Sequence, residues 1–167
     1  MIGVDYARTM ARYNAWQNRS LYREADRLTD EKRREDRGAF FRSIHGTLAH
    51  ILWGDMMWMA RLDGWEKPAV GPADGETWME WGTLKAERAD ADRKILDWAG
   101  KLDDADLTGD LTWYSGVYKR NASKPKWIVI AHFYNHQTHH RGQAHALLTS
   151  FGMTPDATDL GFMPDDV

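Results

Sequence analysis

Apolar residues recur at steps of three and four along four stretches of the chain, the spacing that places them on one face of an α-helix. The pattern predicts helices over residues 5–28, 43–63, 77–102 and 123–150. Gln17 is a polar gap in the first stripe, and Arg88 interrupts the third where the spacing requires another apolar residue. The first three stripes consist of Tyr6, Met10, Tyr13, Leu21, Ala25 and Leu28; of Ile44, Leu48, Ile51, Met59 and Leu62; and of Trp81, Leu84, Ala91, Ile95, Trp98 and Leu102.

Residues typical of helix ends flank these stretches. Thr77 is followed three residues later by Glu80, which has the form of a capping box at the start of the third helix. Pro125 suits the first turn of the last helix, with Ser123 near its cap. Glycines after the second and the last helix predict their C-terminal stops, at Gly64 and Gly152.

The remaining segments are predicted to be connectors. The charged run TDEKRREDRG, residues 29–38, predicts a solvated connector, and EKPAVGPADGE, residues 66–76, predicts a loop. Strand-forming residues surround Ser115-Gly116 and predict a short extended excursion or a hairpin: Thr112, Trp113, Tyr114, Val117 and Tyr118. The tail after Gly152 is expected to be a loop or a single short turn.

Four amphipathic helices with a long connection between the third and the fourth predict an all-α, four-helix bundle. An orthogonal helical domain is the alternative. The length of 167 residues suits one domain, residues 1–167, with a core that needs no covalent staples. Trp53, Met57 and Trp58 lie outside the stripe of the second helix. This helix is therefore apolar on several sides, and we expect one of those sides to contact a second subunit in a homodimer.

Composition narrows the class of protein. The chain has no cysteine, which excludes disulfides, thiolate metal sites and a cysteine nucleophile. The net charge of -3 and the pI of about 6.1 argue against nucleic-acid binding, which needs a basic face. The N-terminus lacks the pattern of a signal peptide, and no apolar run is long enough for a membrane span. We therefore expect a cytoplasmic protein.

Five of the seven histidines lie within residues 132–145. On a helix, His132, His136 and His140 step by four and share one face, which Gln143 joins. His139 points about 100° away from His140, because each residue turns an α-helix by that angle. Two histidines at i and i+4 can hold one divalent cation, although short motifs of this kind also occur by chance.

A third ligand would have to come from His45 or His50 on the second helix. The helical neighbours of His50 are small, with Gly46 and Gly54 one turn away on either side, and Trp53 could form one wall. This surround predicts a hollow, whereas the neighbours of His45 are larger. The alternative for His50 is a core histidine that is hydrogen-bonded to a backbone carbonyl.

The motifs LAHILWGD and HFYNHQTHHRGQAHALL, together with YNAWQN in the first helix, resemble the DinB/YfiT family of metal-dependent proteins, which is distinct from the DNA polymerase called DinB. The match covers nearly the whole chain. The resemblance implies an up-down-down-up four-helix bundle and one divalent metal, commonly nickel or zinc. The family's ligand positions match His50, His136 and His140. The resemblance also implies a dimer.

Several other residues are candidates for the surroundings of a metal. His132 and Gln143 are expected as hydrogen-bonding or pocket residues, with plain packing as the alternative for His132. Tyr13, Asn14 and Asn18 would line the pocket from the first helix or make inter-helix hydrogen bonds. His139 and His145 are expected at the surface or at an interface.

Three features of the helices are interpreted structurally. Asp55 lies on the apolar stripe of its helix and must be paired, and we expect an ion pair with Arg88 in preference to a role as general base. Arg141 is expected to form an ion pair between helices. Gly142 is unfavourable inside a helix, and we expect the close approach of another helix there.

Three function classes remain open. The first is a metal-dependent enzyme with a small-molecule substrate, either a hydrolase or a transferase that activates a low-molecular-weight thiol, both of which the resemblance permits. Three histidine ligands leave positions open for substrate, as in catalytic rather than structural zinc sites. The second is a non-catalytic metal- or small-ligand-binding protein linked to stress. The third is an interaction protein whose metal only holds the bundle together.

Overall fold

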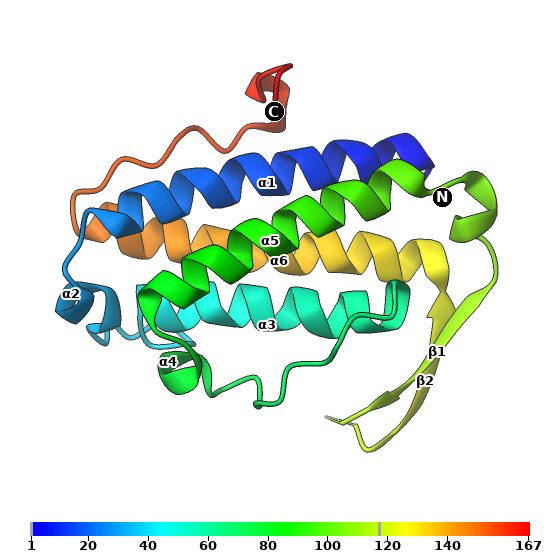
Figure 1. Ribbon diagram of the computed structural model, residues 1–167, viewed down its shortest axis with the longest axis horizontal. Helices are drawn as coiled ribbons and strands as arrows, with labels where there is room; N and C mark the ends of the chain where they lie inside the picture. Colours follow the sequence, from blue (N-terminus) through cyan, green and yellow to red (C-terminus); the bar gives the residue numbers. More distant parts are fainter. Residues whose placement is uncertain (1, 117) are drawn as a thin grey trace.

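The computed structural model describes residues 2–116 and 118–167. Four long helices form its body. Two short helices, one 3-10 turn and one hairpin lie in the connections, and a second 3-10 turn lies in the C-terminal tail (Figure 1). The α-helices are α1 (Val4–Asp26), α2 (Asp30–Arg34), α3 (Ile44–Leu62), α4 (Gly75–Trp78), α5 (Trp81–Lys101) and α6 (Lys126–Ser150). The 3-10 turns are Asp104–Leu107 and Leu160–Phe162, and the strands are β1 (Asp110–Ser115) and β2 (Arg120–Pro125).

The helices run up, down, down and up, which confirms the predicted bundle topology. In Figure 1, α1 and α6 run from right to left, and α3 and α5 run from left to right. The connection between α5 and α6 carries the predicted hairpin, in which Leu111 pairs with Lys124 and Trp113 with Ala122. Tyr118 lies outside the strands, and Val117 lies outside the described residues.

The charged connector after α1 is more ordered than predicted. Thr29 caps α2, with its hydroxyl oxygen accepting a hydrogen bond from the backbone N–H of Lys32. Arg33 is buried, donates to the backbone carbonyls of Ala25 and Leu28, and stacks over Trp81 with its Cζ 4.6 Å from the ring centroid. The charge of this run predicts that it is exposed to solvent, but Arg33 is buried because it satisfies the free carbonyls at the end of α1.

Two predicted caps are wrong. Thr77 belongs to the separate short helix α4 and donates to the carbonyl of Asp74, whereas α5 begins after an extended Glu80 whose side chain makes no cap. Ser123 lies in β2, where its hydroxyl pairs with that of Thr112. Pro125 is the N-cap residue of α6 and not its first turn. Both motifs are short, and contacts with other parts of the chain determine where these residues lie.

A layer of polar side chains divides the apolar core into two clusters. In each long helix, buried polar residues lie between the apolar residues of one cluster and those of the other. The predicted ion pair is confirmed: Arg88 Nη1 lies 2.5 Å from Asp55 Oδ2, and Arg88 Nη2 lies 2.8 Å from Asp92 Oδ1. The layer consists of Asn14, Asn18, Asp55, Arg88, Asp92, Gln137 and Arg141.

The segment after α6 runs back along α1 as an extended strap (Figure 1). Side chains of α1 hold it: Gln17 Nε2 donates to the carbonyl of Ala157, and Ser20 Oγ accepts from the backbone N–H of Asp156. Arg23 and Asp156 add an ion pair of 2.8 Å. The predicted single short turn in this tail is present at Leu160–Phe162.

Candidate metal centre

The antiparallel helices α3 and α6 bring three histidines together. His50 comes from α3, and His136 and His140 come from successive turns of α6. One ring nitrogen from each lies within 4.8 Å of the corresponding nitrogens of the other two. The ring centroids of His136 and His140 are 4.5 Å apart, and that of His50 is 5.3 Å and 4.6 Å from them. These three histidines therefore have a spacing that suits one metal ion.

Hydrogen bonds set the protonation of two of these rings. The Nδ1 of His50 is 3.2 Å from the carbonyl oxygen of Pro72, and the Nδ1 of His140 is 2.8 Å from Oε1 of Gln143. Both partners are acceptors, so each Nδ1 carries the proton and each Nε2 keeps a free lone pair. The Nε2 of His50 lies 3.3 Å from the Nε2 of His136. Lone pairs that converge in this way are what a cation requires.

Burial keeps the three imidazoles neutral. Burial, together with the neighbouring histidines, lowers the pKa of His50 to about 4 and that of His136 to about 3. Burial also lowers the pKa of His140, although the hydrogen bond that His140 donates to Gln143 acts in the opposite direction. All three side chains are unprotonated near pH 7 and free to donate to a metal.

The surroundings of His50 correct one expectation, because the predicted hollow is filled. Phe41 stacks on His50 with ring centroids 3.7 Å apart, and Trp53 stacks at 5.8 Å. The space beside Gly46 holds the carbonyl of Phe41 and the carboxylate of Glu76, and the space beside Gly54 holds the ring of His136. Gly54 thus makes room for the ring of His136, and Gly46 makes room for the backbone of Phe41.

The carbonyl expected as the alternative for His50 is also present, because Pro72 accepts from its Nδ1. The same histidine is therefore fixed by a backbone carbonyl and directed toward the other two. The sequence does not predict that Phe41 and Pro72 contact His50. Both lie in connecting segments, where neither periodicity nor spacing indicates which residue reaches the site.

The other candidate residues of α6 are His132, His139, Gln143 and His145. The ring of His132 is 6.1 Å from that of His136 and 4.9 Å from Trp58, one turn away from the three-histidine group. Gln143 bridges two histidines, because its Nε2 also lies 3.3 Å from Nε2 of the exposed His139. His145 is half-buried.

The residues of α1 bond away from the three histidines. Tyr13 donates to the carbonyl of Thr158 at 2.5 Å, and Asn18 donates to Asp92 Oδ1 at 2.9 Å. Asn14 is buried, and its amide makes no hydrogen bond with the described residues. These side chains belong to the polar layer and to the contact with the C-terminal strap.

Two structural expectations for α6 are wrong. Arg141 is buried but forms no ion pair within the described chain; its Cζ lies 5.2 Å from the ring centroid of Tyr13. A Cβ added at Gly142 would meet nothing within 4 Å in this part of the chain, so no neighbouring helix requires the glycine. Sequence spacing placed both residues on the helix but could not show what lies opposite them.

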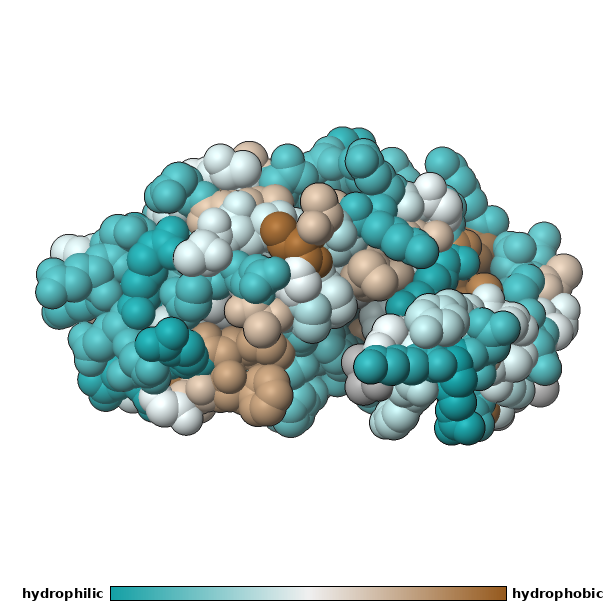
Figure 2. Space-filling model, turned by 90° about the horizontal axis from the view of Figure 1, so that it is seen from below, coloured by the Kyte–Doolittle hydropathy of each residue, from teal (hydrophilic) through white to brown (hydrophobic). Residues whose placement is uncertain are grey.

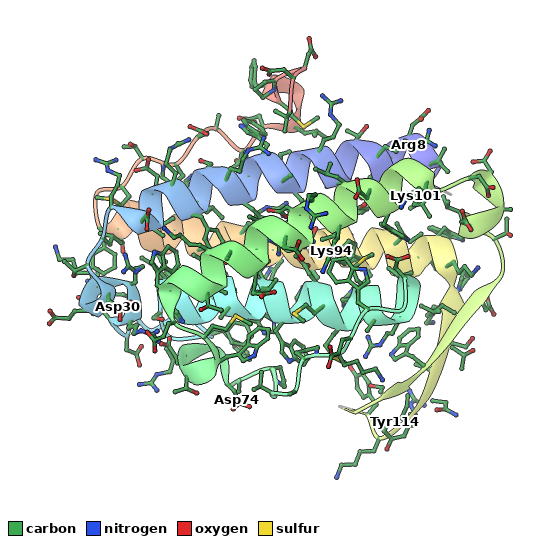
Figure 3. All side chains as sticks on the ribbon, in the orientation of Figure 1. Arg8, Asp30, Asp74, Lys94, Lys101 and Tyr114 are labelled. Atoms are coloured by element: carbon green, nitrogen blue, oxygen red, sulfur yellow. The ribbon has the colours of Figure 1, made fainter. Side chains whose placement is uncertain are left out.

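Two cavities border these elements. A cleft of about 270 Å³ lies beside Phe41, between Gly46 and Glu76. A larger groove of about 900 Å³ lies between α3 and α5 and is lined by none of the three histidines. Lys94 and Lys101 lie along its α5 edge (Figure 3). Among the described residues, the smaller cleft is lined by Phe41, which stacks on His50, but by none of the three histidines, and the larger groove holds no converging ligand atoms. The candidate site is therefore the three-histidine group itself.

Comparison with known proteins agrees with the fold. The family model described as "DinB family" matches residues 4–166. The chain belongs to the DinB family. It is 26% identical over 164 residues to "Protein DinB" of Bacillus subtilis (strain 168), covering 94% of this chain and 92% of that protein. The crystal structure of a DinB-like protein from Bacillus cereus shares the fold with a TM-score of 0.58, at 22% identity, over 85% of this chain and 90% of that one.

The described helices also bear on membrane insertion. No helix in the ranges 2–116 and 118–167 combines the length and the apolar character needed to cross a bilayer.

Proposed function

We propose that His50, His136 and His140 hold one divalent metal ion and that this centre is the active site of a metal-dependent enzyme with a small-molecule substrate. The observation that carries the proposal is the convergence of three neutral ring nitrogens within 4.8 Å of one another. Imidazole donors suit both nickel and zinc. Three protein ligands would leave the metal open to a further ligand, as in catalytic sites.

Within this proposal, a transferase that activates a low-molecular-weight thiol is favoured over a hydrolase. The ligand group contains no carboxylate among the described residues, so the metal would keep its full charge. A cation in that setting lowers the pKa of a thiol and stabilises the thiolate, which is the nucleophile. Hydrolysis would in addition require a general base, and the nearby carboxylate of Asp55 is already paired with Arg88.

The chain's own residues would orient and shield the reaction. Gln143 and Pro72 fix the rings of His140 and His50, and Gly54 leaves room for His136. Phe41 and Trp53 cover His50 with apolar surface and exclude water from that side. The 270 Å³ cleft is lined by Phe41, the ring that stacks on His50.

The test is elemental analysis of single-alanine variants after reconstitution with nickel or zinc. Replacing His50, His136 or His140 should remove most bound metal, whereas His139→Ala should retain it, because His139 is exposed and outside the group. Retention of metal by His136→Ala would contradict the proposal. Assays with ester, amide, halide and epoxide substrates, with and without thiols, then separate transferase from hydrolase and both from a non-catalytic metal-binding protein.

The proposal extends to a cytoplasmic homodimer that does not bind nucleic acid. Half-buried Trp53 and Met57 on α3 support a subunit contact, and the net charge of -3 argues against DNA. Light scattering that gives a monomer mass at micromolar concentration would contradict the dimer. A salt-sensitive shift of DNA in a gel would contradict the second part.

A further inference from the structure

Among the described residues, Arg61, near the end of α3, is a half-buried cation without an anionic partner; it also lines the 900 Å³ groove between α3 and α5. Within the described chain it makes no hydrogen bond, and no carboxylate oxygen lies within 4 Å of it. Its Cζ lies 4.4 Å from the ring centroid of Trp58 and 5.7 Å from that of Trp113 on β1. The more deeply buried Arg88, by contrast, is paired with two carboxylates.

Arg61 lies at the end of a line of aromatic rings that begins at the histidine site. The ring of His132 is 6.1 Å from that of His136 and 4.9 Å from that of Trp58, over which Arg61 stacks. Along α3, Arg61 lies eleven residues after His50. It lies seven residues after Gly54, which contacts His136. At 1.5 Å per residue these separations are about 16 Å and about 10 Å.

Seen from the α3 side, brown and white surface gathers over the middle of the molecule, and a recess separates it from the hairpin that projects at the right (Figure 2). Ring contacts from His136 through His132 and Trp58 to Trp113 connect the histidine site with the hairpin. Trp58 and Trp113 would line the path of a small molecule along these rings, and Arg61 would meet its far end.

The chemistry of Arg61 indicates what that far end carries. Burial removes part of the water from the guanidinium, and the stacked indole rings limit its orientations. A desolvated, oriented guanidinium gains most from a planar oxyanion that accepts two parallel hydrogen bonds. A carboxylate has that shape, whereas a neutral group at the same place would leave the charge unpaired.

We propose that Arg61 binds the carboxylate of the substrate whose other end reaches the metal at His50, His136 and His140. This inference rests on the proposed function and adds a substrate class: a linear molecule with a metal-binding group, such as a thiol, at one end and a carboxylate about 10–16 Å away. Arg61 is then a specificity-determining residue and takes no part in proton transfer.

The experiment uses the full-length protein loaded with cobalt(II), whose thiolate absorption band reports binding at the metal. The probes are mercaptooctanoic acid, its uncharged amide and the corresponding phosphonate. They are titrated into the wild type, Arg61→Gln and Arg93→Gln. Arg93 is an exposed residue of α5, and its replacement makes the same change in net charge away from the α3–α6 face.

We expect the wild type and Arg93→Gln to bind the acid about 10-fold more tightly than the amide, as for a charge-assisted hydrogen bond. Arg61→Gln should lose this preference while its affinity for the amide stays within about 2-fold of the wild-type value.

Three outcomes would overturn the proposal. The first is an equal loss of affinity for acid and amide in Arg61→Gln, which would mean that Arg61 only fastens the hairpin to α3. The second is a wild type without preference for the acid, or with a stronger preference for the phosphonate. The third is the absence of the thiolate band for all probes in all variants, which would contradict both the proposed function and this inference. The first two outcomes would contradict this inference only.

Discussion

The backbone of Gly54 on α3 lies directly against the imidazole of His136 on α6. A Cβ at position 54 would be 2.5 Å from Cε1 of His136 and 3.1 Å from its Nδ1. No side chain can be added there unless the ring moves, and the ring is one of the three that converge. The glycine therefore determines where one of the three candidate metal ligands lies.

Gly54→Ala should displace the ring of His136 and weaken metal binding about 10- to 100-fold, the size of effect seen when the support of a ligand is lost. The matched control is Gly142→Ala on α6, where nothing lies within 4 Å of the added methyl among the described residues. The control should keep its metal affinity and gain about 1 kcal/mol of stability, because alanine is the better helix former. Isothermal titration with zinc measures the first effect and urea unfolding the second. Equal metal affinities for both variants would refute the steric argument.

Gln143→Ala should weaken metal binding by the same order, about 10-fold or more, because Oε1 of Gln143 fixes the Nδ1 proton of His140. Without that acceptor, the ring of His140 can rotate and the proton can move to Nε2, which removes the lone pair. His139→Ala is the matched control, since it deletes the other partner of the same glutamine and leaves the bond to His140. Competition with a chromophoric chelator gives both dissociation constants. A larger effect for His139→Ala than for Gln143→Ala would reverse the assignment.

Asp55→Ala should destabilise the protein by about 3 kcal/mol, because it leaves Arg88 buried with only Asp92 as counter-charge. Asp90→Ala, on the same helix as Arg88, removes a half-buried carboxylate near the surface that pairs with the exposed Arg93 and Lys94, and it should cost about 1 kcal/mol or less. Urea unfolding of the metal-free proteins gives the two free energies of unfolding. Similar small losses would show that the polar layer tolerates an unpaired guanidinium.

Acid should destabilise the metal-free protein through His45, a fully buried residue of α3. Burial lowers the pKa of His45 to about 4, against about 6.5 in the unfolded chain. Above pH 6.5 both states are neutral and the contribution to stability is complete. Between pH 6.5 and pH 4 only the unfolded state takes up the proton, so the free energy of unfolding falls, by an amount on the order of 3 kcal/mol at most.

His45→Gln should therefore show a smaller drop in the free energy of unfolding between pH 7 and pH 5 than the wild type. His139→Gln, which changes an exposed histidine, should show the wild-type drop. Urea titrations with a chelator present at both pH values give the comparison, since bound metal would mask the titration of the ligand histidines. Parallel behaviour of the two variants would mean that His45 is not held neutral by the fold.

The sequence by itself determined the four long helices, because their apolar periodicity is a local property repeated over five or six turns. It also indicated which histidines belong together on α6, since i and i+4 residues share a helical face whatever the helix packs against. The hairpin and the pairing of Asp55 with Arg88 were predictable for similar reasons: strand-forming residues flank a turn, and a carboxylate on an apolar stripe requires a partner.

The tertiary structure alone decided what lies opposite each of these residues. Nothing local indicates that Gly54 makes room for His136 while Gly142 faces open space, that Arg141 stacks on Tyr13 instead of joining an ion pair, or that Arg33 closes the end of α1. Phe41 covers His50 from a connecting segment without periodicity. Periodicity identifies the face of a helix on which a residue lies, whereas the contacts of that residue depend on segments far away in the chain, and only the packed structure brings these together.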